Sequence, residues 1–269
     1  MKKTRVLIVV TTYPLPSRSH DELVCTAGIL ENGDWVRIYP VPFSFWGFHK
    51  YQWIEIAITP QDKNKDFRPE SFRPSQYDLS DFKVIGKIDT AQEWFTRKQL
   101  CLKNVFTNMT ALIEASQPPS NLSLAAFKPR KIKKFIVEDD ERDWKPEWIA
   151  QMKQSDMFAS TKVSSDIFIE KIPYKFKYKF EDDEGRESIM TIEDWEIGAL
   201  YRSCLAAAEG CEVTAVEKVS QKYGDDFLKN KEITLFLGTT LTHHRARHNN
   251  PFTITGVFYP PSTKQPDLF

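Results

Sequence analysis

The segment Tyr174–Phe180, with the sequence YKFKYKF, alternates aromatic and lysine residues without a break. Successive side chains of a β-strand point to opposite faces, so this pattern predicts a strand with one aromatic face and one lysine face. A turn sequence follows, and Arg186–Met190 predicts the returning strand. An aromatic face is usually buried in a core, and the lysine face is then exposed to solvent or meets phosphates. The hairpin is therefore the element around which we expect the C-terminal half to pack.

A helix is predicted directly after this hairpin. Apolar residues recur at i, i+3, i+4 and i+7 from Ile197 to Ala208, and Gly210 is placed to end the helix. Thr191 and Asp194 fit a capping box at its start. A second, antiparallel helix is predicted over Glu212–Tyr223. These elements indicate an α+β fold, in which a mostly antiparallel β-sheet built from hairpins packs against a helical pair.

The start of the first helix carries the acids Glu193, Asp194 and Glu196. At about 100° per residue, Glu193 and Asp194 project to the side of the apolar stripe and Glu196 to its flank. Desolvation there raises a carboxyl pKa toward the range useful for proton transfer, so all three are candidate catalytic residues. Asp194→Asn is expected to abolish activity and to cost about 1 kcal/mol through a weaker cap. The alternative is that these acids only interact favourably with the positive end of the helix dipole.

The N-terminal part begins with a short apolar run, Arg5–Val10, that predicts a buried strand. The loop that follows is rich in proline, serine and charge, and loops that leave a buried strand often carry functional side chains. We take Asp21 as a further candidate catalytic acid, Arg18 and His20 as DNA-binding candidates, and Tyr13 as a base-stacking candidate. A solvated surface loop is the alternative.

The next features are a hairpin over Gly28–Tyr39, turned at Asn32-Gly33, and an aromatic segment over Pro40–His49. Prolines are expected to keep that segment out of a central strand. Its Phe43 and Trp46 are base-stacking candidates if they are half exposed, although packing as a lid on the core is the alternative.

Farther along the chain, Trp53–Ile58 predicts a strand and Ala91–Ala115 one long helix. A proline pair within Gln117–Ser120 is the best boundary between an N-terminal part, residues 1–116, and a C-terminal part, residues 121–269. One continuous domain remains the alternative.

Composition limits the ways in which the chain can meet nucleic acid. The 37 basic and 37 acidic residues give a formal net charge of zero, so DNA contacts must use local patches. One candidate is the basic cluster that contains Lys128, Arg130 and Lys131. The other is the loop Leu241–Asn250, a polar segment suited to phosphate or sugar. Its candidates are His243, His244, Arg245, Arg247 and His248. Both could instead be ordinary surface, the basic cluster neutralised by the acids after it.

Several other classes of site find no support in the sequence. The four cysteines show no C-x-x-C pairing. The positive charges of the two arginines in the histidine loop would repel a metal cation. Neither a metal nor another cofactor is therefore expected. P-loop, G-x-G-x-x-G, H-E-x-x-H and G-x-S-x-G motifs are absent. The apolar run at the start is too short for a signal peptide or a membrane span, so a cytoplasmic protein is expected.

Several motifs together resemble a family of largely uncharacterised bacterial proteins associated with anti-phage defence. The similarity spans most of the chain: TYPLPS and DELVCTAG within Thr12–Gly28, GDWVRIYPVPF at Gly33–Phe43, KIPYKFKYKF and IEDWE within Lys171–Glu196, FLGTT at Phe236–Thr240, and TGVFYPP at Thr255–Pro261. The resemblance implies a relation to defence DNA glycosylases that excise modified bases from phage DNA. It assigns no catalytic residue.

Three functions remain open on this reading. A DNA glycosylase would flip a base among aromatics and use a carboxylate to orient water and stabilise an oxocarbenium-like sugar. A metal-dependent nuclease would hold magnesium with Glu193, Asp194 and Glu196. A DNA-binding or adaptor module would use these acids only structurally, although the neutral net charge favours an enclosed site.

The tail Gln265–Phe269 is similar to the pentapeptide Q-L-[SD]-L-F with which bacterial DNA-processing proteins bind the replication sliding clamp. In that mode Leu268 and Phe269 would fill a pocket, and the Gln265 amide would set the register. Pro266 in place of leucine gives up an apolar contact, so micromolar affinity is expected. Packing of the tail on the domain is the alternative.

Overall fold

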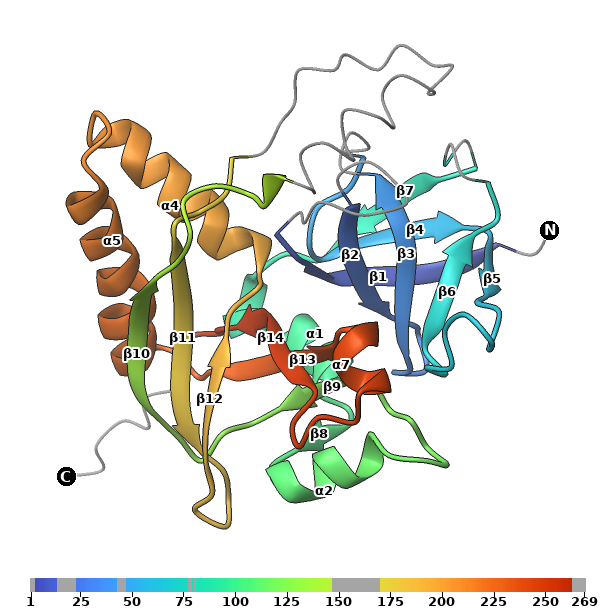
Figure 1. Cartoon of the computed structure of the whole chain (residues 1–269). Coiled ribbons are helices and arrows are strands. Elements are labelled where there is room, and N and C mark those ends of the chain that lie inside the picture. The colour runs from blue at the N-terminus through green and yellow to red at the C-terminus, as the bar shows by residue number, and fades with distance from the viewer. Residues whose placement is uncertain are drawn as a thin grey trace.

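Three β-sheets form the framework of the computed structural model (Figure 1), which describes residues 3–13, 23–42, 47–76, 79, 81–146 and 170–262. The first sheet has seven strands in the order β5-β6-β3-β2-β1-β4-β7. Its members are β1 (Thr4–Thr11), β2 (Leu23–Ile29), β3 (Trp35–Pro42), β4 (Gln52–Ile56), β5 (Ile58–Pro60), β6 (Ser71–Pro74) and β7 (Lys83–Lys87). All but one of its strand pairs are antiparallel, the exception being β3 with β6.

Two smaller sheets are built from the second half of the chain. One has the order β14-β13-β9-β8 and the other β10-β11-β12. Their strands are β8 (Val105–Phe106), β9 (Leu124–Phe127), β10 (Lys131–Asp139), β11 (Tyr174–Glu181), β12 (Glu187–Thr191), β13 (Thr234–Thr239) and β14 (Phe252–Phe258). The fold is therefore α+β with mostly antiparallel sheets, as the sequence predicted.

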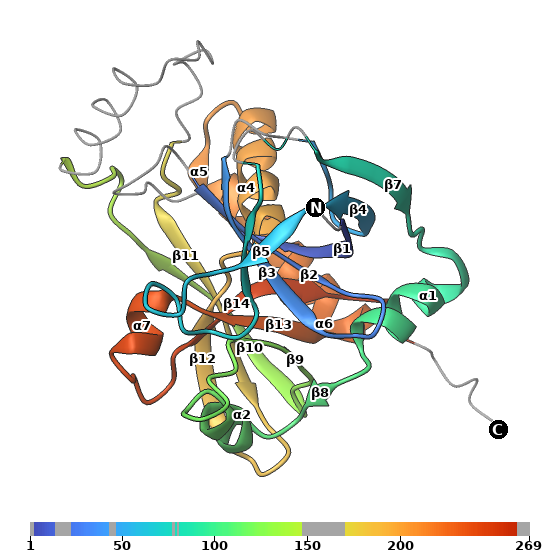
Figure 2. The ribbon, with the colours of Figure 1, turned by 90° about the vertical axis from the view of Figure 1, so that its right-hand side faces the viewer.

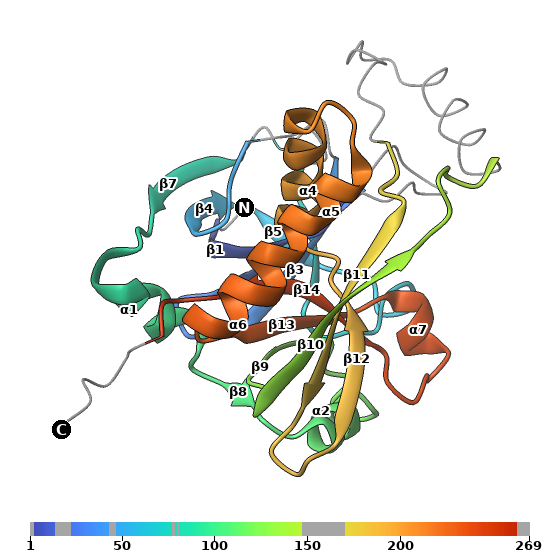
Figure 3. The same ribbon diagram turned by 90° about the vertical axis from the view of Figure 1, so that its left-hand side faces the viewer.

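The predicted helical pair is confirmed, and it packs on the three-stranded sheet. It consists of α4 (Trp195–Ala207) and α5 (Glu212–Ser220), which continues through η1 (Gln221–Asp226), a π-helix, into α6 (Phe227–Asn230). Figures 1 and 3 show α4 and α5 side by side against β10 and β11. Phe176, Tyr178 and Phe180 point inward from β11 and are buried with the apolar stripe of these helices. The predicted aromatic face is thus the core face.

The lysine face of β11 meets carboxylates of its neighbouring strands. Lys175 pairs with Asp140 at 2.9 Å, Lys177 with Glu138, and Lys179 with Glu187 at 2.7 Å. The three ammonium groups are therefore balanced within the sheet, and a phosphate would have to compete with these pairs.

The predicted helix over Ala91–Ala115 is wrong, because a strand interrupts it. The structure has α1 (Ala91–Cys101), then β8, then α2 (Met109–Ala115). Val105 pairs with Ala126, a partner in β9, and Asn108 caps α2 by accepting from the backbone N–H of Ala111. Pairing with a distant strand outweighs the local helical period here. Figure 2 shows α1 and β7 together at one side of the molecule.

Three smaller expectations also need correction. The run Trp53–Ile58 is divided between β4 and β5, which lie near opposite edges of the seven-stranded sheet. Pro40 and Pro42 belong to β3. β6 pairs with Arg37 and Ile38, and in the described part of the chain no strand pairs with this end of β3 from that side, so prolines are tolerated there. The histidine loop contains a short helix, α7 (Leu241–Arg245).

Candidate functional site

The residues just before α4 join the two halves of the molecule. The backbone N–H of Tyr13, at the end of β1, donates to the carbonyl of Glu193 at 2.8 Å. The N–H of Glu193 in turn donates to the carbonyl of Ile254 in β14 at 2.7 Å. This short extended segment places Asp194 between the seven-stranded sheet and β14, where its side chain is 0% exposed.

Asp194 forms a buried ion pair with Lys50, a residue from the loop before β4. The Lys50 Nζ lies 2.6 and 2.7 Å from the two carboxylate oxygens of Asp194, and its side chain is 8% exposed. The carboxylate also accepts the backbone N–H groups of Glu196 at 3.1 Å and of Val257 at 3.0 Å. Each oxygen of Asp194 therefore has an ammonium and an amide as partners.

This geometry corrects the predicted helix start. Asp194 is the N-cap of α4, while Thr191 ends β12 and takes no part in a capping box. The sequence motif placed the cap one turn too early, because strand pairing extends through Thr191. The carboxylate does face the interior, as the helical projection indicated, but it is a cap and an ion-pair partner there.

Burial and the short distances between charges shift the pKa values of both Lys50 and Asp194. Burial by itself lowers the pKa of a lysine, but the carboxylates of Asp194 and Glu196 raise the pKa of Lys50 above its usual value. Burial raises the pKa of Asp194, and the Lys50 ammonium acts against that shift. The two backbone N–H donors also favour the charged form of Asp194, so we treat the pair as ionised.

Glu196 is the acid of the cluster that combines partial exposure with a contact to Lys50. One of its oxygens lies 3.3 Å from Lys50 Nζ, while its side chain is 36% exposed. Glu193 is half-buried on the other side of the segment, where burial raises its pKa and Lys175 opposes the shift. The three predicted acids therefore differ: Asp194 is closed off, Glu193 faces Lys175, and Glu196 is held by Lys50 at the surface.

An aromatic group borders this cluster. Lys50 is followed by buried Tyr51, whose ring packs edge-on against Trp94 at 5.9 Å. Trp94 contacts Tyr259 at 5.1 Å between ring centroids, and both are only partly buried. Burial, with the charges of Glu196 and Asp194 nearby, raises the pKa of Tyr259 to about 12 although Lys50 opposes the shift. Tyr259 therefore lies near the Glu196 carboxylate, and its ring also stacks on Phe227 at 4.2 Å between centroids.

Tyr13 is not placed to stack on a base. Its ring is 9% exposed and stacks on Trp195 at 5.6 Å with an interplanar angle of 18°. Its hydroxyl accepts from Arg202 Nε at 2.7 Å and donates to the carbonyl of Glu170 at 3.0 Å. The ring also lies over Gly198 of α4, where a Cβ would come within 2.4 Å of it. Tyr13 therefore packs α4 against the first sheet.

The predicted basic patch is partly neutralised within the fold. Lys128 pairs with Glu232 at 3.3 Å, and Arg130 pairs with Glu181 at 3.4 Å. Lys131 is exposed at the start of β10. The acids after the cluster were the predicted partners; Glu232 and Glu181, from other parts of the chain, take that role instead.

The histidine loop divides into one buried residue and an exposed group. His244 is 3% exposed, with Nδ1 3.0 Å from the Thr239 hydroxyl and Nε2 2.7 Å from the Ser116 carbonyl. It is therefore a structural residue and not a DNA contact. His243, Arg245, Arg247 and His248 are exposed, and Arg245 donates to the carbonyl of Lys65. Figures 1 and 3 show α7 beyond β12, away from β10, so the two basic groups do not form one surface.

The remaining candidates lie outside the described residues: Arg18, His20, Asp21, Phe43, Trp46, Gln265, Leu268 and Phe269. Lys50, Trp94 and Tyr259 were missed by sequence reasoning. A lone lysine between His49 and Tyr51 carries no motif, and only the tertiary structure brings it to Asp194, 144 positions away.

Within the part of the chain that the structure describes, no group of three or more histidine, cysteine, aspartate or glutamate side chains has a metal-binding arrangement. The donor set predicted for magnesium does not fit either, because a lysine and two amides occupy the Asp194 oxygens. Among the described helices, none is long and apolar enough to cross a membrane.

Comparison with known proteins identifies families without a stated function. Residues 2–103 match the model described as Domain of unknown function (DUF8758), and residues 105–269 match Domain of unknown function (DUF8757). The second model covers more than half of the sequence, so the chain belongs to the DUF8757 family. The two matches meet around Asn104, before α2 and before the boundary expected from the proline pair.

No curated protein matches the chain. Among solved structures, it is similar to a murine DNA-binding protein bound with double-stranded DNA, at 11% identity and a TM-score of 0.31. That match covers 97% of this chain and 95% of the other. So low a TM-score carries no argument about fold or function.

Proposed function

We propose that this member of the DUF8757 family is a DNA glycosylase of phage defence, which excises a modified base with Glu196 as the catalytic carboxylate. The observation that carries the proposal is the partly exposed Glu196 carboxylate, held 3.3 Å from Lys50, with Tyr259 nearby and Trp94 packed on Tyr259. DNA as substrate, and a modified base in particular, come from the motif resemblance in the sequence.

The chemistry assigned to this cluster needs one carboxylate and one aromatic surface. Glycosidic bond cleavage builds positive charge on the sugar, which a fixed carboxylate stabilises while it orients the attacking water. A base turned out of the duplex is held by stacking on aromatic rings. Glu196 would supply the first function, and Trp94 with Tyr259 the second.

Lys50 and Asp194 have positioning roles in this proposal. The Lys50 ammonium orients the Glu196 carboxylate, and Asp194 fixes Lys50 from the buried side. The raised pKa of Lys50 reduces the fraction of neutral amine, so it is a poor nucleophile for a covalent intermediate with an abasic sugar. We therefore expect a glycosylase without lyase activity.

The test is a single-turnover assay on duplexes with hypermodified or unmodified cytosine, in excess EDTA. Abasic sites that break only after mild alkali are expected, and borohydride should trap no covalent adduct. Glu196→Gln should reduce the rate at least about 100-fold. Glu217→Gln, which changes an exposed acid on α5, is the matched control and should leave the rate unchanged.

Two results would replace this proposal. Direct, magnesium-dependent nicking would identify a nuclease. Tight DNA binding without release of any base would favour a binding or adaptor module. A Glu196→Gln variant that is folded and fully active would move the catalytic role to another acid, with Asp21 and Glu22 of the N-terminal loop tested next.

Binding of the C-terminal tail to a bacterial sliding clamp also stays a proposal, supported by its sequence alone. Removal of Gln265–Phe269 should abolish binding to a purified clamp in calorimetry and leave the melting temperature unchanged. An intact protein that does not bind at tens of micromolar would refute the clamp contact.

A further inference from the structure

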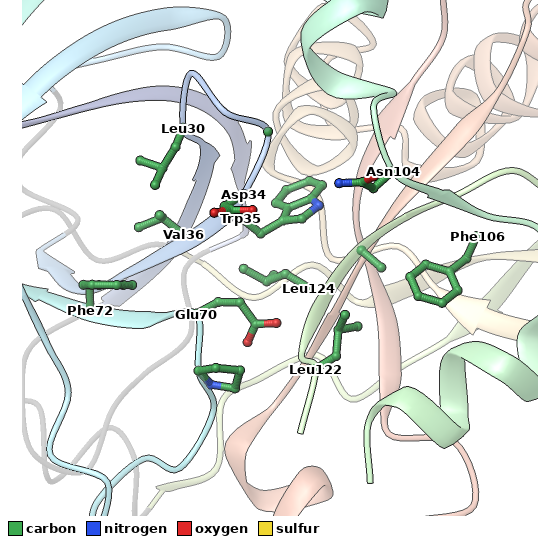
Figure 4. A pocket seen from close by; sticks show the side chains of 13 residues that line it. Leu30, Asp34, Trp35, Val36, Glu70, Phe72, Asn104, Phe106, Leu122 and Leu124 are labelled. Carbon is green, nitrogen blue, oxygen red and sulfur yellow. The ribbon is translucent and has the colours of Figure 1, made fainter. Parts of the chain in front are cut away.

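A pocket of about 390 Å³ lies between the seven-stranded sheet and the sheet that contains β9, away from the Lys50 cluster. It is open to solvent at one side, and its size is within the usual range of small-molecule sites, about 300–1,000 Å³. Figure 4 shows Trp35 and the Glu70 carboxylate beside the same space as Asn104, Phe106 and Leu122. The lining residues come from both family-matched segments.

The lining combines aromatic walls with two carboxylates and one amide. Trp35, Phe72 and Phe106 contribute rings, and the other apolar lining residues are leucine, valine, alanine and proline. The polar side chains are those of Asp34, Glu70 and Asn104, and among the described residues no lysine, arginine or histidine lines the pocket. A phosphate or carboxylate ligand would find no cationic partner here, so the lining favours ligands that donate N–H groups.

The Glu70 carboxylate is held in place and its charge is balanced from behind. One oxygen accepts the backbone N–H of Ser123 at 3.0 Å, and the other accepts the Ser123 hydroxyl at 2.8 Å. The same hydroxyl accepts from Arg37 Nη1 at 2.8 Å, and this guanidinium is 2% exposed. Each Glu70 oxygen keeps accepting capacity. Arg37 therefore lies behind Glu70 and partly offsets its charge, which reduces the advantage of a cation over a neutral donor.

We infer that this pocket binds a neutral nucleobase or nucleoside that carries an exocyclic amine, such as cytidine or adenosine. The aromatic rings contact the planar base, Glu70 accepts from the amine, and the Asn104 amide pairs with the remaining ring edge. The pocket shares no residue with the Lys50, Asp194 and Glu196 cluster, so this inference stands independently of the proposed glycosylase activity.

Ligand-observed NMR titration of the whole protein tests the assignment. Cytidine and adenosine should bind with dissociation constants below about 1 mM. Uridine presents a carbonyl where cytidine has its amine and should bind at least about 10-fold more weakly. Cytidine monophosphate should bind more weakly than cytidine, because the pocket carboxylates repel its phosphate. Agmatine, a guanidinium compound, tests whether the pocket prefers a cationic ligand, and it should also bind more weakly than cytidine.

Two variants locate the binding. Glu70→Gln should remove the preference for cytidine over uridine. Asn104→Ala changes an exposed residue of the lining and should weaken cytidine at least about 5-fold, whereas Asn249→Ala, an exposed control outside the pocket, should not. The inference is overturned if cytidine fails to bind at millimolar concentration, if agmatine or the monophosphate binds more tightly, or if Asn104→Ala binds like the wild type.

Discussion

Replacement of Asp194 by asparagine tests the reasoning about the buried ion pair most directly. The change keeps the shape of the side chain but turns one acceptor oxygen into an N–H donor. If the amide NH2 takes the place of Oδ2, Lys50 Nζ and the N–H of Val257 are left facing a group that can accept from neither. Lys50 keeps Glu196, at 3.3 Å, as its remaining acidic partner.

The expected cost is set by the charge left behind. Removal of one partner of a buried ion pair typically costs about 3–5 kcal/mol, because the other charge stays desolvated. Asparagine still caps a helix well, so little of this cost comes from the cap. Partial compensation by Glu196 places the expectation near the lower end, about 3 kcal/mol. For a chain of this size this lowers Tm by about 6–12 °C.

Urea denaturation followed by circular dichroism measures the change in the free energy of unfolding. Glu187→Gln is the control, because its ion pairs with Lys133 and Lys179 are on the surface and should be worth no more than about 1 kcal/mol. Lys50→Met combined with Asp194→Asn should cost less than the sum of the single changes. A loss below 1 kcal/mol for Asp194→Asn, or strict additivity in the double variant, would refute the assignment.

Further predictions concern acid stability and packing at the joint between α4 and β1. Asp140 is partly desolvated, but hydrogen bonds from Lys171 and Lys175 lower its pKa to about 2. A lowered folded-state pKa stabilises the fold above the unfolded value, about 3.9, and this contribution is lost as pH falls toward 2. Asp140→Asn should therefore remove up to about 1 kcal/mol at pH 7 and flatten the stability profile between pH 4 and 2; an unchanged profile would contradict the pairing. Gly198→Ala places a methyl group on the Tyr13 ring, where a Cβ would lie 2.4 Å away, and should cost about 1–3 kcal/mol in the same denaturation assay. Gly86→Ala is the control, because a Cβ there meets no atom within 4 Å. A Gly198→Ala protein as stable as the wild type would show that Tyr13 can move away freely.

The elements that the sequence predicted well are those with a strong local period. Alternation in Tyr174–Phe180 and the apolar stripe after Ile197 follow from the geometry of one strand and one helix. Each has a buried face that needs a partner layer, so the α+β class followed as well. The Asn32-Gly33 turn belongs to the same group, because Gly33 has the positive φ of 98° that such a turn requires.

The errors arose where a distant partner outweighed local preference. Ala91–Ala115 reads as helix, but pairing of Val105 with β9 divides it. Pro40 is tolerated in β3 because no strand among the described residues pairs with that end from the other side. His244 reads as one member of a polar loop, yet Thr239 and Ser116 hold it in the interior. The β9 partner of Val105 and the Ser116 partner of His244 lie outside the window that a local pattern samples, although Thr239 is only five positions from His244.

The candidate site also combines features that local sequence predicts with features that distant residues determine. The sequence by itself determined that acids stand at the start of α4, because a cap and the first turn of a helix are local features. Only the tertiary structure decided their roles: it brings Lys50 to Asp194 across 144 positions, closes that carboxylate off, and leaves Glu196 partly exposed near Tyr259. Burial and charge pairing depend on residues that meet only in the folded chain, and these two quantities separate a structural acid from one that can reach a substrate.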